Sequence, residues 1–433
     1  MGITIENSWK NTGGLWQDPD LAGVKSSLLR YRPRPIQPQE CLSPLVLTLR
    51  GPRRSGKTVS LKLLVAELIE EKGMNPKDIT WTSLETLRTL KQMEEHLLEV
   101  FSKYKPKILF IDEVTSVTGW QQVIKKYRDN GLFSQMCIVL TGSSAHDLKA
   151  GAERMAGRRG GFELYDRVLL PMSYKDFHEQ TEGAVEDYLS VGGFPFRVNQ
   201  FKKTKVQNLT WDDSFGMSVF DEVFFYEITR RKLSRSIGLE VLSRISQIKT
   251  TSISYESFAK SISITKDTAR KYLDVLGESF LLSTISHYDT SKGRVAPKKE
   301  KKLTWVDPAL GSFASWTKQG ESLDSPARAE LVVGIELIKR HEMRLWEGLS
   351  APRNVFTWKS KSGSEIDFLV VDRSKKLTYP IEVKFQNEIS NSDFIVMEKA
   401  FGKGLLVTKN DTRKREKSSS VKLSEFLLSD DLF

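Results

Sequence analysis

Residues 45–60 read LVLTLRGPRRSGKTVS and contain the strongest motif of the chain. An apolar run ends at Leu49, a loop bounded by Gly51 and Gly56 follows, and a helical pattern of leucines begins after Thr58. A strand, then G-x-x-x-x-G-K-[ST], then a helix is the context in which this motif forms a phosphate-binding loop. Backbone N–H groups of such a loop and the N-terminus of its helix bind phosphate oxygens.

The residue types of this loop predict ATP and Mg²⁺ as cofactors. Lys57 is expected to reach the β- and γ-phosphates during catalysis, and the Thr58 hydroxyl is expected to hold Mg²⁺. A chance glycine-rich turn is the alternative interpretation. The residues expected to contact the nucleotide are Gly51, Pro52, Arg53, Arg54, Ser55, Gly56, Lys57, Thr58 and Val59.

Two adjacent carboxylates end a second buried run. The sequence KILFIDE begins at Lys107 and ends in Asp112 and Glu113. A central parallel strand delivers charge at its carboxyl end in this way. We expect Asp112 to bind Mg²⁺ and Glu113 to polarise the attacking water. The pattern is weak alone, because hydrophobic strands often end in Asp, but its position shortly after a phosphate loop strengthens it.

Two further segments complete the predicted nucleotide site. The apolar strand 137–141 is followed by Ser143 and Ser144, where a polar side chain can sense the γ-phosphate; an ordinary turn is the alternative. Arg158 and Arg159 lie between two glycines, so a guanidinium there could reach a nucleotide in a neighbouring subunit and stabilise transition-state charge. A surface loop is the alternative for this segment.

Length and charge limit the possible classes of protein. At 433 residues the chain is expected to form about two to four domains. Lys and Arg number 66 against 55 Asp and Glu, and the net charge is +11. Such an excess attracts nucleic-acid backbones, although a solvated, charge-rich surface is the alternative for any one cluster. The basic clusters lie at residues 202–205, 230–232, 298–302 and 413–415.

Cysteine content and hydropathy exclude other classes. Two cysteines and five scattered histidines offer neither a disulfide framework nor a zinc site of several cysteines. No apolar run approaches the ~18 residues of a membrane span, and the first residues lack the apolar core of a signal peptide. We therefore expect a cytoplasmic protein without membrane contact.

A series of motifs in fixed order spans nearly the whole chain. GPRRSGKT, ILFIDEV, GW at 119–120, VLTGSSA, AGRRG and LLPMSYKDF are followed by YLSVGGFP at 188–195. The series resembles prokaryotic AAA-type ATPases with a C-terminal winged helix and nuclease-like domain. The resemblance implies an AAA-like ATPase core, with Ser143 or Ser144 at the sensor position and Arg158 as the arginine finger. Two features depart from it: Arg159 duplicates the finger, and no convincing second-sensor arginine follows.

The middle of the chain predicts helices that lead into a DNA-binding pattern. Residues 172–245 read as a helical lid and linker. A first helix at 255–261, a second capped by Thr265 and a wing strand at 280–285 resemble a winged helix. The second helix of that motif commonly reads the major groove. A helical domain used for packing or subunit contact is the alternative.

The last third contains a second constellation of charged residues. Glu330 begins a helical pattern, Asp367 and Glu382 lie on successive predicted strands, and Lys384 shares a face with Glu382. Carboxylates and a lysine at one sheet edge can bind Mg²⁺ and activate water for phosphodiester attack. This looks like the D…ExK core of restriction-endonuclease-like folds, with Glu330 as the helix carboxylate. A vestigial constellation is the open alternative.

Together these patterns predict an α/β protein with a P-loop NTPase (AAA-like) parallel sheet, a helical lid, a winged helix and an α/β restriction-endonuclease-like domain. We expect a Mg²⁺-dependent ATPase that binds and remodels or translocates DNA, as a homo-oligomer for which the resemblance to ring ATPases suggests a hexamer. The alternatives are an ATP-dependent switch that binds a protein partner and an ATP-gated, Mg²⁺-dependent DNA nuclease. The expected domains are 1–175, 176–245, 246–310 and 320–433.

Overall fold

The computed structural model divides the chain into two compact units, residues 1–170 and 171–433. The first contains one parallel sheet, and the second contains a three-stranded and a five-stranded sheet together with a short two-stranded hairpin. The division lies close to the end of the expected ATPase domain at residue 175. The structure describes residues 7–11, 14–142, 144–161, 164–205, 218–312, 322–342, 345–372 and 377–429.

Five parallel strands form the sheet of the first unit, in the order β2-β3-β4-β1-β5. The central strands consist almost entirely of apolar residues because both of their faces are buried. Since β4 lies between β3 and β1, this is the expected P-loop NTPase sheet, with the loop strand and the carboxylate strand separated by one neighbour. The bounds are β1 (Val46–Arg50), β2 (Ile79–Ser83), β3 (Ile108–Asp112), β4 (Cys137–Thr141) and β5 (Asp166–Val168).

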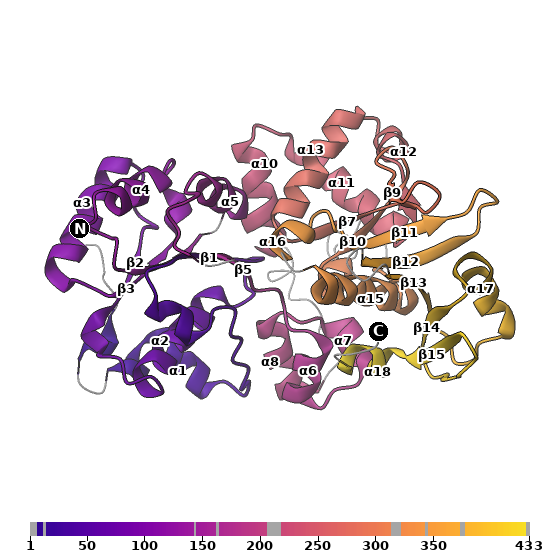
Figure 1. Cartoon of the computed structure of the whole chain (residues 1–433), viewed down its shortest axis with the longest axis horizontal. Coiled ribbons are helices and arrows are strands. Elements are labelled where there is room, and N and C mark those ends of the chain that lie inside the picture. Colours follow the sequence, from indigo (N-terminus) through magenta and orange to yellow (C-terminus); the bar gives the residue numbers. More distant parts are fainter. Residues whose placement is uncertain are drawn as a thin grey trace. The chain divides into compact units, whose positions relative to one another are not determined.

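Helices cover both faces of this sheet (Figure 1). Leucines of α2 pack with α1 against one face, and apolar side chains of α3, α4 and α5 pack against the other. Alternate residues of β3 and β4 therefore enter different cores, as the pleat of a strand requires. The bounds are α1 (Pro19–Ser26), α2 (Lys57–Glu70), α3 (Leu90–Tyr104), α4 (Gln121–Asp129) and α5 (Ala145–Glu153).

A buried ion pair attaches the N-terminal segment to the helix that follows the loop. The ammonium of Lys62 on α2 lies 3.0 Å from Asp18 and 2.6 Å from Asp20. Asp18 also caps α1, since its side chain accepts the backbone N–H groups of Asp20 and Leu21. The first helix is thereby fixed against the helix of the nucleotide-binding motif.

The second unit begins with α6 (Tyr174–Thr181), α7 (Val185–Val191) and α8 (Pro195–Thr204). These helices belong to the range expected to form a lid. In the structure α7 packs against α15 (Ser325–His341), and α6 packs against α18 (Leu423–Leu428). The segment thus shares a core with the C-terminal part of the chain.

A three-stranded antiparallel sheet with the order β6-β10-β7 follows. One helix precedes β6, two helices lie between β6 and β7, and a hairpin lies between β7 and β10. A winged helix arranges its elements in this order. The bounds are α11 (Arg235–Ile248), β6 (Ser252–Ile253), α12 (Tyr255–Ser261), α13 (Lys266–Glu278), β7 (Leu282–Ser286), β8 (Tyr288–Asp289), β9 (Arg294–Val295) and β10 (Lys301–Trp305).

A mixed five-stranded sheet, in the order β11-β12-β13-β14-β15, completes the second unit (Figure 1). The first three strands pair antiparallel, and the last three pair parallel. The long helix α15 packs against β10, β12 and β13. The bounds are β11 (Val355–Lys359), β12 (Glu365–Asp372), β13 (Leu377–Lys384), α17 (Ile395–Phe401), β14 (Gly404–Thr408) and β15 (Ser418–Lys422).

The YLSVGGFP segment forms a tight contact with a buried carboxylate. The N–H of Gly193 donates to Asp307 Oδ2 over 2.8 Å, and the N–H of Ala309 donates to Asp307 Oδ1 over 2.9 Å. A Cβ on Gly192 would lie 2.2 Å from Asp307 Oδ1. Glycine is therefore required here by the close approach of the carboxylate.

A comparison of Gly192→Ala with Gly402→Ala tests this contact, because their φ angles are 74° and 73° but only Gly192 is crowded. At Gly402, which caps α17, a side chain costs about 1 kcal/mol of left-handed strain. At Gly192 a ψ of −172° and the Asp307 carboxylate add to that strain, so we expect Gly192→Ala to lower the free energy of unfolding by more than about 3 kcal/mol. Urea unfolding of the full chain measures both; equal losses would contradict the steric argument.

Candidate active site

The loop between β1 and α2 has the backbone geometry that its glycines predict. Gly51 has a φ of 148°, and a Cβ at this position would lie 2.1 Å from the carbonyl oxygen of Leu169. Gly56 caps α2 in the left-handed conformation, with a φ of 91°. The buried Ser55 hydroxyl closes the loop by donating to the carbonyl of Pro52 over 2.9 Å.

The ammonium of Lys57 lies inside this loop. Its Nζ donates to the carbonyl oxygens of Gly51 and Pro52, over 3.1 and 2.9 Å. Burial lowers the pKa of Lys57 to about 8, although the carboxylates of Glu113 and Asp112 act in the opposite direction. A lysine so desolvated gains most from an anion, and a phosphate is the anion that such a loop binds.

A hydroxyl and a carboxylate meet beside the lysine. Thr58 Oγ1 donates to Asp112 Oδ2 over 3.2 Å, and the N–H of Glu113 donates to Asp112 Oδ1 over 2.9 Å. Burial, followed by the charge of Glu113, raises the pKa of Asp112 to about 6. An oxygen pair of this kind fits Mg²⁺, which prefers oxygen ligands and keeps part of its water shell.

Glu113 has an uncommon backbone conformation. Its φ is 51°, although it is not a glycine, and it directly follows the last residue of β3. Residues held in this region cost of order 1 kcal/mol and cluster at active sites. The strained turn bends the chain where the expected catalytic carboxylate leaves the strand.

The sensor position lies at the end of β4, between the strands that carry the loop and Asp112. Ser143, expected to act there, lies outside the described residues. Ser144 is buried, its hydroxyl accepts the N–H of Asp147 to cap α5, and its own N–H donates to Thr115 Oγ1 over 3.3 Å. No pattern in the sequence indicates Thr115. Its hydroxyl packs closely against Gly142, because a Cβ added at Gly142 would lie only 2.6 Å from it.

The two candidate arginines have different environments. Arg159 is buried, its guanidinium forms a two-point ion pair with Asp166 at 3.0 and 2.8 Å, and its Nε donates to the carbonyl of Val46. Arg158 is partly exposed, and its Nε lies 2.7 Å from the similarly exposed Asp129. The structure thus uses Arg159 to hold β1 beside β5 and directs Arg158 toward solvent.

The second constellation brings three carboxylates together from α15, β12 and β13. Lys302 of β10 forms ion pairs with Glu330 and with Asp367, the latter at 3.0 Å, and Lys384 lies 2.8 Å from Glu382. Burial, followed by the charge of Asp367, raises the pKa of Glu382 to about 7, while Lys384 opposes the shift. Within the described ranges no group of three or more His, Cys, Asp or Glu residues is arranged to hold a metal ion. In this structure the carboxylates of the possible second site are paired with Lys302 and Lys384.

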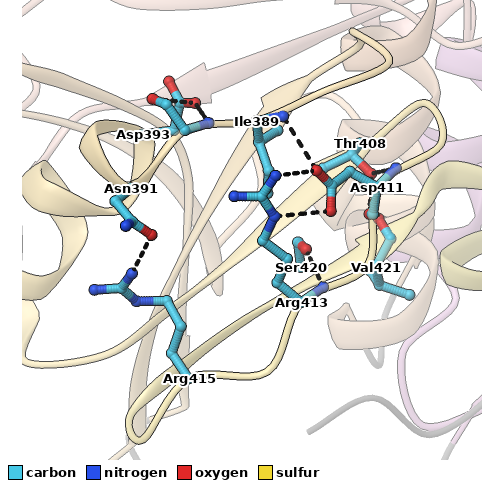
Figure 2. Close-up of polar contacts among 10 residues, drawn as sticks. Ile389, Asn391, Asp393, Thr408, Asp411, Arg413, Arg415, Ser420 and Val421 are labelled. Carbon is cyan, nitrogen blue, oxygen red and sulfur yellow. Dashed lines mark hydrogen bonds and ion pairs between the residues drawn. The ribbon is translucent and has the colours of Figure 1, made fainter.

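Two arginines of one basic cluster, residues 413–415, have polar partners within the chain, and Figure 2 shows the contacts of Arg413 with Asp411 and of Arg415 with Asn391. The guanidinium of Arg413 donates to both carboxylate oxygens of Asp411, over 3.1 and 2.7 Å. Arg415 donates to Asn391 Oδ1 over 2.7 Å and pairs with Glu398 at 3.0 Å. These arginines stabilise the connection between β14 and β15, so their charge is not fully available to an external phosphate.

Three family models match successive parts of the chain. Residues 43–178 match the model of an AAA domain, the range that holds the loop, the carboxylates and the arginines described above. The chain carries an AAA domain. Two models described only as domains of unknown function, DUF8612 and DUF4143, match residues 182–320 and 327–426. The AAA prediction from the motif series is therefore confirmed, and the matched segments follow one another along the chain.

Similar sequences occur in bacteria and archaea. An uncharacterized protein of Haemophilus influenzae is 26% identical over 318 residues, covering 68% of this chain and 74% of that protein. An uncharacterized protein of Methanocaldococcus jannaschii is 23% identical over 373 residues, covering 80% of this chain and 76% of that protein.

Two solved structures are similar to part of the chain. A Walker-type ATPase of Pyrococcus abyssi has 14% identity and a TM-score of 0.41, with coverage of 65% of this chain and 93% of that chain. The replication initiator DnaA, bound to AMPPCP and single-stranded DNA, has 15% identity and a TM-score of 0.31, with coverage of 56% and 86%. The fold assignment rests on the sheet order and the motifs. In the part of the chain that the structure describes, no helix combines the length and apolar character needed to cross a membrane.

Arg158→Ala and Arg159→Ala distinguish the two arginines. Loss of Arg159 leaves Asp166 without its buried partner, so we expect the first unit to lose about 3–5 kcal/mol of stability. Loss of the exposed Arg158–Asp129 pair is expected to cost less than about 1 kcal/mol, while ATP turnover falls at least about a thousandfold if Arg158 is the finger. Thermal unfolding and phosphate release measure the two effects. Unchanged turnover in Arg158→Ala would exclude this role.

Asp112→Asn tests the burial of the carboxylate that is expected to bind Mg²⁺. Because its pKa rises from 3.8 to about 6, the folding contribution of this group is fully present below 3.8 and is lost as the pH rises through about 6. An asparagine has no charge to desolvate, so we expect it to raise the free energy of unfolding by up to about 3 kcal/mol at pH 8. The gain falls to roughly half at pH 5. Urea unfolding without nucleotide measures this increase in the free energy of unfolding. Equal increases at pH 5 and pH 8 would contradict the raised pKa of Asp112.

Proposed function

We propose that this protein is a Mg²⁺-dependent ATPase that binds DNA and uses hydrolysis to remodel it or to move along it. The observation that carries the proposal is the contact between Thr58 and Asp112, with Lys57 inside the loop and Glu113 next in the chain. These four residues provide a phosphate cradle, an oxygen pair for Mg²⁺ and a carboxylate for water, which are the parts that phosphoryl transfer to water needs.

The proposed mechanism assigns one task to each residue. The N–H groups of the loop and the ammonium of Lys57 would bind the β- and γ-phosphates, and Thr58 and Asp112 would hold Mg²⁺. The metal, when bound, neutralises charge on the phosphates. Glu113 orients a water molecule for in-line attack and accepts its proton. Arg158 of a neighbouring copy stabilises the transition state, so the protein acts as a homo-oligomer, with a hexamer as the first arrangement to test.

Exposed cations support α13 and the neighbouring hairpin as the DNA-binding surface. Several other basic side chains are paired internally: Arg231 lies 2.6 Å from Glu278, and Lys302, Arg413 and Arg415 have the partners given above. On α13 and the connection from β7 to β10, basic side chains remain exposed where a winged helix contacts a duplex. They are Lys266, Arg270, Lys271, Lys292, Arg294, Lys298 and Lys299. Two of them also have acidic neighbours, since Arg270 lies 3.7 Å from Asp274 and Lys292 lies 3.9 Å from Asp289.

Combined replacement of Lys266, Arg270 and Lys271 by Ala tests this surface. Each lost phosphate contact lowers the slope of log affinity against log salt by about 0.9, so we expect the slope to fall by about 2–3 and the DNA affinity to fall at least about tenfold. Equilibrium binding to duplex DNA at several salt concentrations measures both. ATP turnover with and without single-stranded, duplex and branched DNA shows whether binding is coupled to hydrolysis.

Two controls accompany this experiment. Lys202→Ala with Lys203→Ala removes two basic side chains from α8 in the same unit and is expected to leave DNA affinity unchanged. Lys57→Ala is expected to abolish turnover while it leaves DNA binding in the absence of ATP intact. If the α13 variant and the α8 control bind DNA equally, or if affinity is independent of salt, the DNA part of the proposal is wrong.

A further inference from the structure

The carboxylate cluster of the second unit encloses a lysine from another sheet. Lys302 belongs to β10 of the three-stranded sheet, and its side chain is 6% exposed. Its ammonium pairs with Glu330 of α15 and with Asp367 of β12, 3.0 Å away. Carboxylates on a helix and a strand edge that converge on one cation normally indicate a metal ion. Here the cation at their centre is an amino-acid side chain.

Every oxygen of the three carboxylates has a donor within the protein. Besides Lys302, Glu330 accepts the Thr250 hydroxyl over 2.6 Å, and Asp367 accepts the N–H of Val383 over 2.9 Å. One oxygen of Glu382 pairs with Nζ of Lys384 at 2.8 Å, and the other accepts a hydrogen bond from the N–H of Asp367 over 3.2 Å. A divalent ion would have to displace these donors, because it needs about six oxygen ligands of its own.

The space beside the cluster is also small. A cavity lined by Lys302, Asp367, His287 and Trp358 has an internal volume of about 20 Å³. That volume holds about one water molecule. This pocket borders Lys302 and Asp367 but is not lined by Glu330, Glu382 or Lys384. Charge and ligand satisfaction point in the same direction.

We propose that Lys302 takes the place of a divalent cation in this cluster. The cluster is then a permanent ion-pair joint between β10, α15 and β12, and the second unit does not cut nucleic acid through Asp367. The proposal is independent of ATP hydrolysis, since all of its residues lie in the second unit. It assigns to Lys302, within the basic segment 298–302, a role inside the protein instead of at a DNA surface.

Asp367→Asn tests the proposal through the sign of its effect on stability. In a metal site without its metal, loss of one carboxylate relieves repulsion and raises the melting temperature. If the cluster is an ion pair that holds the elements together, the same change removes a partner of Lys302 and lowers the melting temperature. We expect a lower melting temperature for the full chain, measured without nucleotide. A higher one would overturn the proposal.

Metal binding gives a second, independent readout. Mn²⁺ titration followed by electron paramagnetic resonance is expected to give the same number of bound ions for the wild-type chain and for Asp367→Asn. One additional ion in the wild type would overturn the proposal. This comparison remains informative even if variants at Lys302 fail to fold.

Lys302→Met removes the ammonium between Glu330 and Asp367 and replaces it with an uncharged side chain of similar length. We expect a lower melting temperature that Mn²⁺ partly restores, with no restoration when Asp367→Asn is added. Lys301→Met is the matched control, because Lys301 lies on the same strand and its ammonium donates to the carbonyls of Pro297 and Lys299 instead of a carboxylate. Failure of Mn²⁺ to stabilise Lys302→Met beyond this control would show that Lys302 does not replace a cation.

Discussion

The parallel sheet of the first unit brings the carboxyl ends of β1, β3 and β4 to one edge, and the nucleotide site depends on that constraint. The edge is a place where polar groups lose water. Burial lowers the pKa of Lys57 to about 8 and raises that of Asp112 to about 6. Burial thus disfavours the charged forms of Lys57 and Asp112, although the two side chains lie close together. The proposed phosphates and divalent ion would supply the opposite charges that each group lacks, so their binding would offset a desolvation cost already present in the fold.

The same physical argument distinguishes lysines that maintain structure from the lysine that binds a ligand. Lys62 is desolvated, yet Asp18 and Asp20 raise its pKa above the usual value, and Glu330 with Asp367 does the same for Lys302. These ammonium groups have their counter-charges within the protein. The pKa of Lys57 moves downward, because its bonds are to carbonyl oxygens and the carboxylates do not compensate its burial. Lys57 therefore gains from an external anion, and perturbed pKa values caused by burial are concentrated at functional sites.

The sequence predicts some of these features and not others for a physical reason. The phosphate loop is recognisable because its backbone requires glycine at Gly51 and Gly56, and such local requirements appear as fixed spacings. Apolar strands that end in charge are local as well, so the parallel sheet and the Asp112 carboxylate could be predicted. The partners of Lys302 lie 28 and 65 residues away in the chain. No spacing rule relates them, and the surrounding basic segment suggested an exposed surface instead.

The two adjacent arginines show how tertiary pairing limits the choice of a catalytic group. A guanidinium that serves a neighbouring subunit must leave its resting contacts during each catalytic cycle. Release of Arg159 would break a buried, two-point ion pair with Asp166, at a cost of several kcal/mol. Release of Arg158 would break an exposed pair with Asp129 worth at most about 1 kcal/mol. An arginine finger is worth about 4–7 kcal/mol in transition-state stabilisation, so the smaller cost of releasing Arg158 favours it over Arg159 as the proposed finger.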